Sequence, residues 1–282
     1  MLTPVLIAGP KCATFARQGR RDKDRNCEFE GGQSGTIIRS VHCHRGASGI
    51  GRASTLHFAD CGGQVVAVDI NAEGLATLAS DRIHVERADI TKSAECKKVS
   101  EKASSLGKVA GLFNCAGLEI HGTVVTMPEE DWNRVIAVNL TAIFLMSKHV
   151  IPLMEAAGGG AIVNMSSVQA HATQPDVAAY TATKGAVISM TRVMAIDHGR
   201  KNIRVNAICP GTIETPLAQA VARMYNPKDP SAKFAEWGAK HALGRIGQPI
   251  EVARLAAFLL SSDAGFITGS FHLVDGGMLA ML

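Results

Sequence analysis

The chain has 282 residues, of which 46% are hydrophobic and 19% charged, so it can bury a sizeable core and is neither disordered throughout nor collagen-like. Residues 1–45 hold eight of the 29 Lys and Arg and four of the 25 Asp and Glu, which leaves 21 residues of each sign in the remainder. This neutral body argues against a nucleic-acid-binding protein. No apolar run approaches about 18 residues, so no membrane span is expected. The seven scattered cysteines contain no CxxC pair, which predicts a cytoplasmic protein.

Two regions differ in their patterning. Residues 1–35 show no sustained period and are predicted to be an N-terminal extension, either disordered or misread. Residues 36–282 alternate short apolar strands with amphipathic helices, which predicts one α/β domain with a parallel sheet covered by helices on both faces. Seven strands are expected at 37–43, 64–69, 82–87, 108–114, 160–166, 202–208 and 270–275. Helices are expected at 49–61, 92–106, 129–155, 177–199 and 250–261.

A glycine-rich turn, Ser48-Gly49-Ile50-Gly51, leads into the first predicted helix. Backbone N–H groups at such a turn, together with the helix dipole, suit a pyrophosphate. Asp69 follows Gly49 by twenty residues, at the end of the next strand, where its carboxylate can accept hydrogen bonds from both ribose hydroxyls of an adenosine and repel a 2′-phosphate. The set predicts a site for NAD rather than NADP, although the turn alone also fits a purely structural role.

Four polar residues suggest alcohol chemistry. Tyr180 and Lys184 are four apart in a predicted helix and share one face. Ser167 follows a strand thirteen residues before Tyr180, and Asn139 lies in the preceding helical segment. A Tyr-xxx-Lys pair alone is common on surfaces, but the set predicts that Tyr180 takes the proton of a secondary alcohol while Ser167 holds its oxygen. The charges of Lys184 and of an oxidised nicotinamide would lower the pKa of Tyr180 from about 10 toward neutrality.

From about residue 36 to 282 the chain resembles the short-chain dehydrogenase/reductases, whose fold is a single Rossmann-type doubly wound domain with a seven-stranded parallel sheet. The resemblance implies that Asn139 helps to hold a proton-relaying water and that Lys184 contacts the nicotinamide ribose. It also implies a homotetramer in which helices 129–155 and 177–199 pair across subunits. The cofactor contacts it implies, besides Ser48 to Gly51, Asp69, Tyr180 and Lys184, are Ile70, Asp89, Ile90, Asn114, Ala116, Gly117, Pro210, Gly211, Ile213 and Thr215.

The phosphate turn departs from the family pattern Thr-Gly-x-x-x-Gly-Ile-Gly, because His44 and Arg45 replace Thr and the first Gly. If that position is left-handed, a non-glycine residue there costs about 1–2 kcal/mol, and an arginine could crowd the cofactor. One alternative is therefore a non-catalytic nucleotide-binding or scaffold protein disabled at Arg45. Another is that residues 1–45 are partly a frameshifted reading, since a one-base shift of the codons for 42–45 can yield Ile-Val-Thr-Gly.

The substrate is predicted to be a small polar molecule, hydroxylated or carboxylated. Gln169, His171 and Gln174 lie where the family builds its pocket wall, and Glu119 and His121 follow the glycine of the cofactor site. Their polar side chains suit such a substrate better than a steroid.

Other segments refine the expected class. The motifs HGTV at 121–124 and EEDW at 129–132 resemble a subset that includes cytosolic type 2 3-hydroxybutyrate dehydrogenases and bacterial dehydrogenases of keto-deoxy sugar acids such as 2-keto-3-deoxy-L-fuconate. The 3-hydroxybutyrate dehydrogenases have an arginine three residues before the catalytic tyrosine, and this chain has Val177 there. The resemblance therefore does not carry over specificity for hydroxybutyrate. Residues 216–240 are expected to form a mobile lid. The His and Cys residues of 42–44 lack a second ligand cluster, so no metal is expected.

Overall fold

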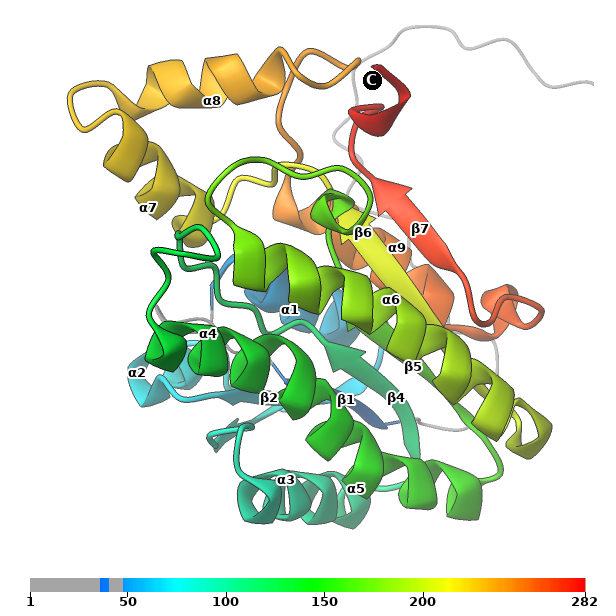
Figure 1. The fold of residues 1–282 in the computed structure, drawn as a ribbon. Helices are drawn as coiled ribbons and strands as arrows, with labels where there is room; N and C mark the ends of the chain where they lie inside the picture. Colours follow the sequence, from blue (N-terminus) through cyan, green and yellow to red (C-terminus); the bar gives the residue numbers. More distant parts are fainter. Residues whose placement is uncertain (1–35, 41–47, 282) are drawn as a thin grey trace, which may run out of the picture.

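The computed structural model describes residues 36–40 and 48–281, which form one α/β unit around a seven-stranded parallel sheet (Figure 1). The strand order is β3-β2-β1-β4-β5-β6-β7. From β1 the chain adds β2 and β3 on one side of the sheet, and from β4 it adds β5, β6 and β7 on the other side. Doubly wound folds bind ligands at the point between β1 and β4 where the strand order reverses. The predicted fold class is confirmed. The strands are Thr36–Ser40 (β1), Gln64–Asp69 (β2), Ile83–Arg87 (β3), Val109–Asn114 (β4), Gly160–Met165 (β5), Ile203–Pro210 (β6) and Phe271–Val274 (β7).

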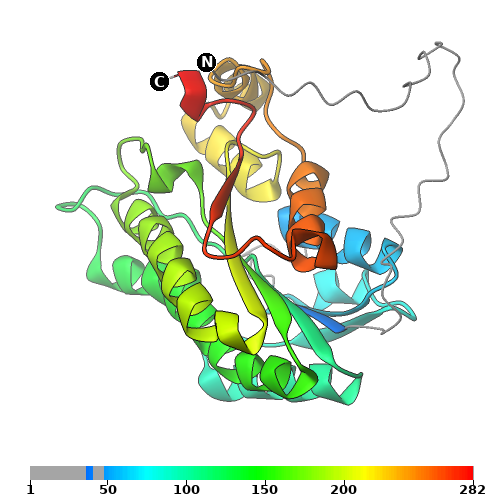
Figure 2. The same cartoon turned by 90° about the vertical axis from the view of Figure 1, so that its right-hand side faces the viewer.

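Helices cover both faces of the sheet (Figure 2). Helices α1 and α9 pack together on one face, and α3, α5 and α6 cover the other. The helices are Gly49–Asp60 (α1), Ala72–Ala76 (α2), Ser93–Ser105 (α3), Glu129–Ile136 (α4), Ala142–Ala157 (α5), Ala178–His198 (α6), Pro216–Tyr225 (α7), Pro230–Gly238 (α8) and Pro249–Leu260 (α9). The predicted extension 1–35 and the residues His44 and Arg45 lie outside the described part of the chain.

A hydrophobic core lies on each face of the sheet, because side chains alternate between the two faces along every strand. Successive side chains of a strand point to opposite faces, so a strand covered on both sides is apolar throughout. In β2, Val65 packs in a cluster with Phe58 of α1, whereas its neighbour Val66 packs with Met146 of α5. All four side chains are fully buried. The sheet is thereby fixed between its helical layers, and the carboxyl ends of its strands meet at one edge.

One continuous helical stretch, Glu129–Ala157, is long and apolar enough by composition to cross a membrane. It comprises α4, a π-helical turn over Ala137–Thr141 and α5. Half of its apolar window is buried inside the fold, where α5 packs against β4. Its apolar character is therefore accounted for by its place over the sheet, as in the core helix of a globular domain.

The lid region 216–240 contains two helices that the sequence analysis did not assign. Thr215 caps α7 through a hydrogen bond from Ala218 N at 3.2 Å, and Asp229 caps α8 through one from Ala232 N at 3.1 Å. Each cap is followed by a proline at the first helical position, where the missing N–H has no partner to lose. Residues 216–240, which were expected to form a mobile lid, are therefore folded as two helices joined by a short turn.

Candidate active site

The predicted site residues meet at the carboxyl edge of the sheet. Asp69 and Asn114 are the last residues of β2 and β4, and Ser167 lies just beyond β5. Pro210 ends β6, and Gly49 begins α1 above the sheet. Because the strands are parallel, side chains that are far apart in the sequence share this edge.

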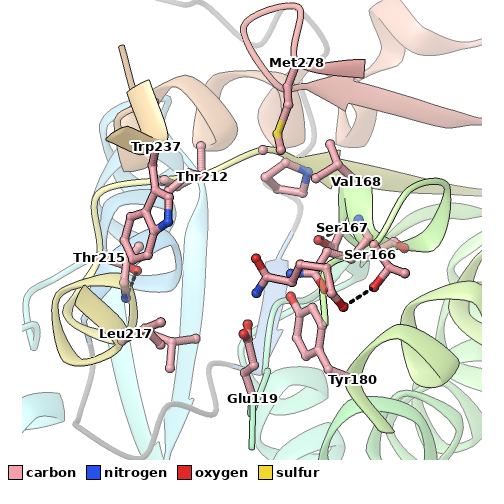
Figure 3. A pocket seen from close by; sticks show the side chains of 18 of the residues that line it. Glu119, Ser166, Ser167, Val168, Tyr180, Thr212, Thr215, Leu217, Trp237 and Met278 are labelled. Carbon is pink, nitrogen blue, oxygen red and sulfur yellow. Dashed lines mark hydrogen bonds between the residues drawn. The ribbon is translucent and has the colours of Figure 1, made fainter. Parts of the chain in front are cut away.

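Tyr180 and Lys184 extend from one face of α6, next to the segment that follows β5. Lys184 is 1% exposed, and its Nζ donates a hydrogen bond to Met165 O at 2.9 Å and lies 5.3 Å from the centre of the Tyr180 ring. The hydroxyl of Ser167 faces the same cavity as that of Tyr180 (Figure 3) and lowers the pKa of the Tyr180 hydroxyl. The structure therefore brings three of the four predicted catalytic residues together.

Burial shifts the pKa values of both Tyr180 and Lys184. Burial raises the pKa of the Tyr180 hydroxyl, the nearby Glu119 carboxylate raises it further, and the Ser167 hydroxyl lowers it. Burial also lowers the pKa of Lys184 to about 8. The chain by itself thus holds Tyr180 as a phenol, and its ionisation requires added positive charge at the site.

Asn139 lies behind this group, in the π-helical turn between α4 and α5. Its Oδ1 accepts from Leu118 N at 2.8 Å, and its Nδ2 donates to Leu118 O at 2.9 Å and to Thr183 Oγ1 at 3.2 Å. The side chain is fully buried. Asn139 therefore joins the loop after β4 to α6, and the structure assigns it a bracing contact rather than a direct place in the cavity.

Three residues predicted to contact a dinucleotide have buried polar atoms without a hydrogen-bond partner within the described residues. They are Ser48 Oγ, Asp69 Oδ2 and Asn114 Oδ1. The other carboxylate oxygen of Asp69 accepts from Asn71 N at 2.9 Å, and burial raises its pKa to about 6. Buried acceptors of this kind are costly unless a ligand completes them. A ribose of an adenosine supplies hydroxyl donors that fit Asp69.

Two glycines of the predicted cofactor site differ in what they require. Gly49 has φ +59°, a left-handed conformation that glycine adopts without strain, and a Cβ there would lie 3.1 Å from Thr215 Cγ2. A Cβ on Gly117 would lie 3.8 Å from Lys184 Nζ, an ordinary van der Waals separation. The backbone therefore requires glycine at position 49, whereas Gly117 lies beside the lysine without being required by space, and its neighbour Ala116 is buried.

Three other predicted cofactor residues are less open to a ligand. The Asp89 carboxylate accepts from Thr91 N at 3.0 Å and Thr91 Oγ1 at 2.6 Å and pairs with Lys92 at 3.4 Å. Ile90 is 2% exposed and its side chain belongs to the core. Ile70 follows Asp69, where its carbonyl accepts from Arg87 Nε at 3.2 Å.

A cavity of about 330 Å³ lies next to Tyr180. Figure 3 shows the side chains of Ser167 and Tyr180 on one side, Glu119 below, Thr215, Leu217 and Trp237 on the lid side, and Met278 above. Gln169 and Gln174, which were predicted to lie at the substrate, line this cavity. It is also lined by five residues that were predicted to contact the cofactor, namely Ile50, Pro210, Gly211, Ile213 and Thr215. Asn139 and Lys184 are buried behind its wall.

His171 does not line this cavity, in contrast to the prediction. A 3-10 turn over Val168–Ala170 directs it toward β7, where its ring lies 4.5 Å from that of Phe271 and its Nε2 lies 3.8 Å from Cys209 Sγ. The loop position was correct, but the turn rotates this side chain away.

Sequence reasoning missed several cavity residues. Met278 and Leu279 reach the cavity because β7 lies beside β6, a pairing that no local motif encodes. Leu217 and Val221 come from α7, whose cap and proline were the available signal. The structure also shows no cluster of three or more His, Cys, Asp or Glu suited to a metal in residues 36–40 and 48–281.

Glu119 carries a negative charge into the cavity wall. Its carboxylate faces the same space as the Tyr180 hydroxyl (Figure 3). It lies 3.3 Å from His121 Nε2, and this contact raises the pKa of His121. The other nitrogen of His121, Nδ1, lies 3.2 Å from the Tyr225 hydroxyl at the end of α7. Glu119 is thus linked through His121 to the lid.

Known proteins share this sequence and fold. A family model described as enoyl-(acyl carrier protein) reductase matches residues 46–279. "Dehydrogenase/reductase SDR family member 6" of Aquarana catesbeiana is 37% identical over 234 residues, covering 82% of this chain and 94% of that protein. The 2-keto-3-deoxy-L-fuconate dehydrogenase of Xanthomonas campestris pv. campestris is 38% identical over 234 residues, covering 82% and 76%.

A solved structure agrees with these relatives. The aldohexose dehydrogenase of Thermoplasma acidophilum superposes with a TM-score of 0.80 at 35% identity, covering 87% of this chain and 95% of that one. Levodione reductase gives a TM-score of 0.82 at 28% identity, covering 89% and 100%. Such enzymes use a nicotinamide cofactor and act on small alcohols and ketones. The chain therefore belongs to the short-chain dehydrogenase/reductase family of oxidoreductases.

Proposed function

We propose that this chain is an NAD-dependent oxidoreductase that interconverts a secondary alcohol and a ketone on a small polar substrate. The observation that carries the proposal is the juxtaposition of Ser167, Tyr180 and buried Lys184 beside a cavity of about 330 Å³. Buried polar atoms of Ser48, Asp69 and Asn114 that have no partner in the described part of the chain lie at the same edge of the sheet. Together they supply a proton-transfer group, a substrate space and a nucleotide cradle.

NAD is the cofactor that fits Asp69. Its carboxylate retains one oxygen without a partner in the described part of the chain, and the two hydroxyls of an adenosine ribose would complete it. A 2′-phosphate would bring a second negative charge against the same carboxylate. Asp69 therefore favours NAD over NADP.

The residues of the chain perform the proton chemistry. When bound, the nicotinamide accepts or delivers the hydride and, in its oxidised form, adds positive charge. Ser167 donates to or accepts from the substrate oxygen and holds it next to Tyr180. The Tyr180 hydroxyl exchanges the proton with that oxygen, and Lys184 stabilises the tyrosinate by its charge. Asn139 keeps the loop after β4 in place behind this group and, as the family resemblance implies, helps to hold a relay water.

The cavity supports a hydroxylated substrate. Gln169, Gln174 and Glu119 offer acceptors for hydroxyl groups, and Glu119 opposes a substrate carboxylate placed next to Tyr180. Lys240 lines the lid side and could meet a carboxylate at the far end. A sugar or sugar acid with its reacting carbon near Tyr180 would place hydroxyl groups at the acceptors beside Tyr180 and its far end at Lys240. The substrates that give two similar enzymes their names, an aldohexose and a keto-deoxy sugar acid, agree with this class.

We further propose a cytoplasmic homotetramer. Large apolar side chains are exposed on the helices expected to pair across subunits, including Phe144 on α5 at 52% and Ile196 on α6 at 78%. The alternative of a scaffold disabled at Arg45 rests on a residue outside the described part of the chain. The assembled catalytic group favours the enzyme over that alternative.

The proposal is tested by a substrate screen with NAD, in which NADH formation is followed for sugars, sugar acids and simple secondary alcohols. We expect turnover with a hydroxylated substrate, and a loss of at least about 100-fold in kcat for Tyr180→Phe, because a phenyl ring cannot exchange the proton. NAD affinity should stay within about twofold, since the hydroxyl contributes little binding of the ground state. Tyr225→Phe, at the only other tyrosine, is the matched control and should lose far less. Full turnover by Tyr180→Phe would refute the assigned group.

A further inference from the structure

His241 follows the lid directly and is 3% exposed. Its Nε2 accepts a hydrogen bond from Thr212 N at 3.2 Å, and its Nδ1 lies 2.8 Å from Trp237 O. A backbone N–H can only donate, and a backbone carbonyl can only accept. The imidazole is therefore neutral, with its proton on Nδ1.

These two hydrogen bonds join two segments that lie side by side in the cavity wall (Figure 3). The side chain of Trp237 lines the cavity from α8, and Thr212 lines it from the loop after β6. Gly211 makes the contact possible, because a Cβ there would lie 2.8 Å from His241 Nε2. Leu243, two residues after His241, connects this segment to the turn that carries Met278. Its N–H donates to Gly276 O at 3.0 Å.

Three charged residues share a second, smaller space with His241. Asp275, Arg245 and Glu251 line a cavity of about 200 Å³ together with the imidazole. Asp275 accepts from two backbone N–H groups, of Gly277 at 3.0 Å and of Leu279 at 2.9 Å. Arg245 bonds Glu251 at 2.9 and 2.7 Å. Their hydrogen-bonding groups are thus engaged with one another and with backbone, and the imidazole keeps its two backbone partners.

The geometry points to His241 as a positioning residue that fixes the C-terminal end of the lid, residues 216–240, to the loop at Pro210–Thr212 and so holds this part of the cavity wall in place. Near the turn between α7 and α8, the lid is held by an exposed contact between Tyr225 and His121. A buried pair of hydrogen bonds resists opening more than an exposed one, because water cannot replace the lost partners. The lid is therefore held more firmly at His241 than at the turn between its two helices. Only the statement that the cavity receives substrate rests on the proposed function.

Hydrogen exchange read by mass spectrometry tests this role on the full chain, without cofactor or substrate. We expect His241→Leu to accelerate exchange of the α8 amides, 230–238, about tenfold, because two hydrogen bonds that oppose local opening are lost. Exchange in β4, Val109–Asn114, should not change. The control is His84→Leu, which removes a histidine contact with Gln64 at 3.0 Å far from the lid. It should leave α8 unchanged.

A second variant separates positioning from general destabilisation. The side-chain amide of His241→Asn can still donate to Trp237 O, so we expect it to restore most of the protection of α8. Unchanged exchange of α8 in His241→Leu would overturn the proposal. Equal acceleration of α8 and β4, or equal effects of the Asn and Leu variants, would overturn it as well, because a merely structural core residue gives those results. Since no ligand is present, these outcomes are independent of the oxidoreductase assignment.

Discussion

At the scale of single residues, the site is defined by polar groups that the fold buries without fully satisfying them. Asp69 keeps one carboxylate oxygen without a partner in the described chain, and Lys184 is buried with one hydrogen bond to Met165 O. Both could be predicted from spacing, because their roles require a fixed distance along the chain from a turn or a tyrosine. The position of His171 could not, since a single 3-10 turn decides its direction.

The buried lysine should leave a signature in the pH dependence of stability. The pKa of Lys184 falls from 10.5 to about 8 on folding, so between these values the unfolded chain binds more protons than the folded one. The free energy of unfolding contributed by this residue therefore rises with pH through that window. Tyr180, whose pKa is raised, opposes this only above its ordinary value of 10.0.

Urea unfolding of the wild type and of Lys184→Met across this window measures the effect. The difference in unfolding free energy between the two proteins should shift in favour of the wild type as the pH rises from about 8 to 10. Parallel curves would show that the folded chain does not depress the pKa of Lys184.

At the scale of elements, the periodicity of the sequence was sufficient for the strands and the long helices. Strands such as β2 and β5 are short, apolar and buried on both faces, which gives an unambiguous pattern. The predicted helix 129–155 is correct in extent, but its π-helical turn at Ala137–Thr141 has no signal of its own. The short helix α2 was missed because five residues carry too little period. Helices α7 and α8 were missed although Pro216 and Pro230 mark their starts.

The stability of the fold should depend on the hydrogen bonds between Asn139, in the π-helical turn, and the backbone of Leu118. We expect Asn139→Leu to lower the free energy of unfolding by about 2–4 kcal/mol, because the buried N–H and C=O of Leu118 lose their partners. Asn133→Leu, on the exposed face of α4, is the matched control and should change stability by less than about 0.5 kcal/mol. Urea unfolding followed by circular dichroism measures both variants. Equal stabilities would mean that Asn139 does not brace the loop after β4.

At the scale of the whole molecule, the parallel sheet explains why most of the candidate site could be inferred from local motifs. Each motif follows a strand, and parallel strands place their carboxyl ends together. Residues that enter the cavity from elsewhere, such as Met278 and Trp237, depend on the pairing of β6 with β7 and on the docking of the lid. The contact of Met278 with the cavity has no local pattern and could not be predicted, whereas Trp237 was expected only as part of a lid at 216–240.

The exposed apolar side chains on α5 and α6 predict assembly with further copies of the chain. We expect sedimentation velocity to give a mass of about four chains of 29.7 kDa each. Phe144→Glu should reduce that mass, because a charge cannot be buried without a partner in the interface. Val125→Glu, at a more exposed loop position away from α5 and α6, is the control and should preserve the mass. A wild-type chain that sediments as a monomer would contradict the tetramer.

The most direct test of the account is a calorimetric titration of the chain with NAD and, separately, with NADP. We expect NAD to bind with a Kd of about 1–100 μM and NADP at least about tenfold more weakly, since the 2′-phosphate of NADP meets the Asp69 carboxylate. NAD affinity should fall as the pH drops below about 6, where Asp69 takes up a proton and loses an acceptor. Binding of neither nucleotide, or tighter binding of NADP, would contradict the assignment of an NAD-dependent enzyme.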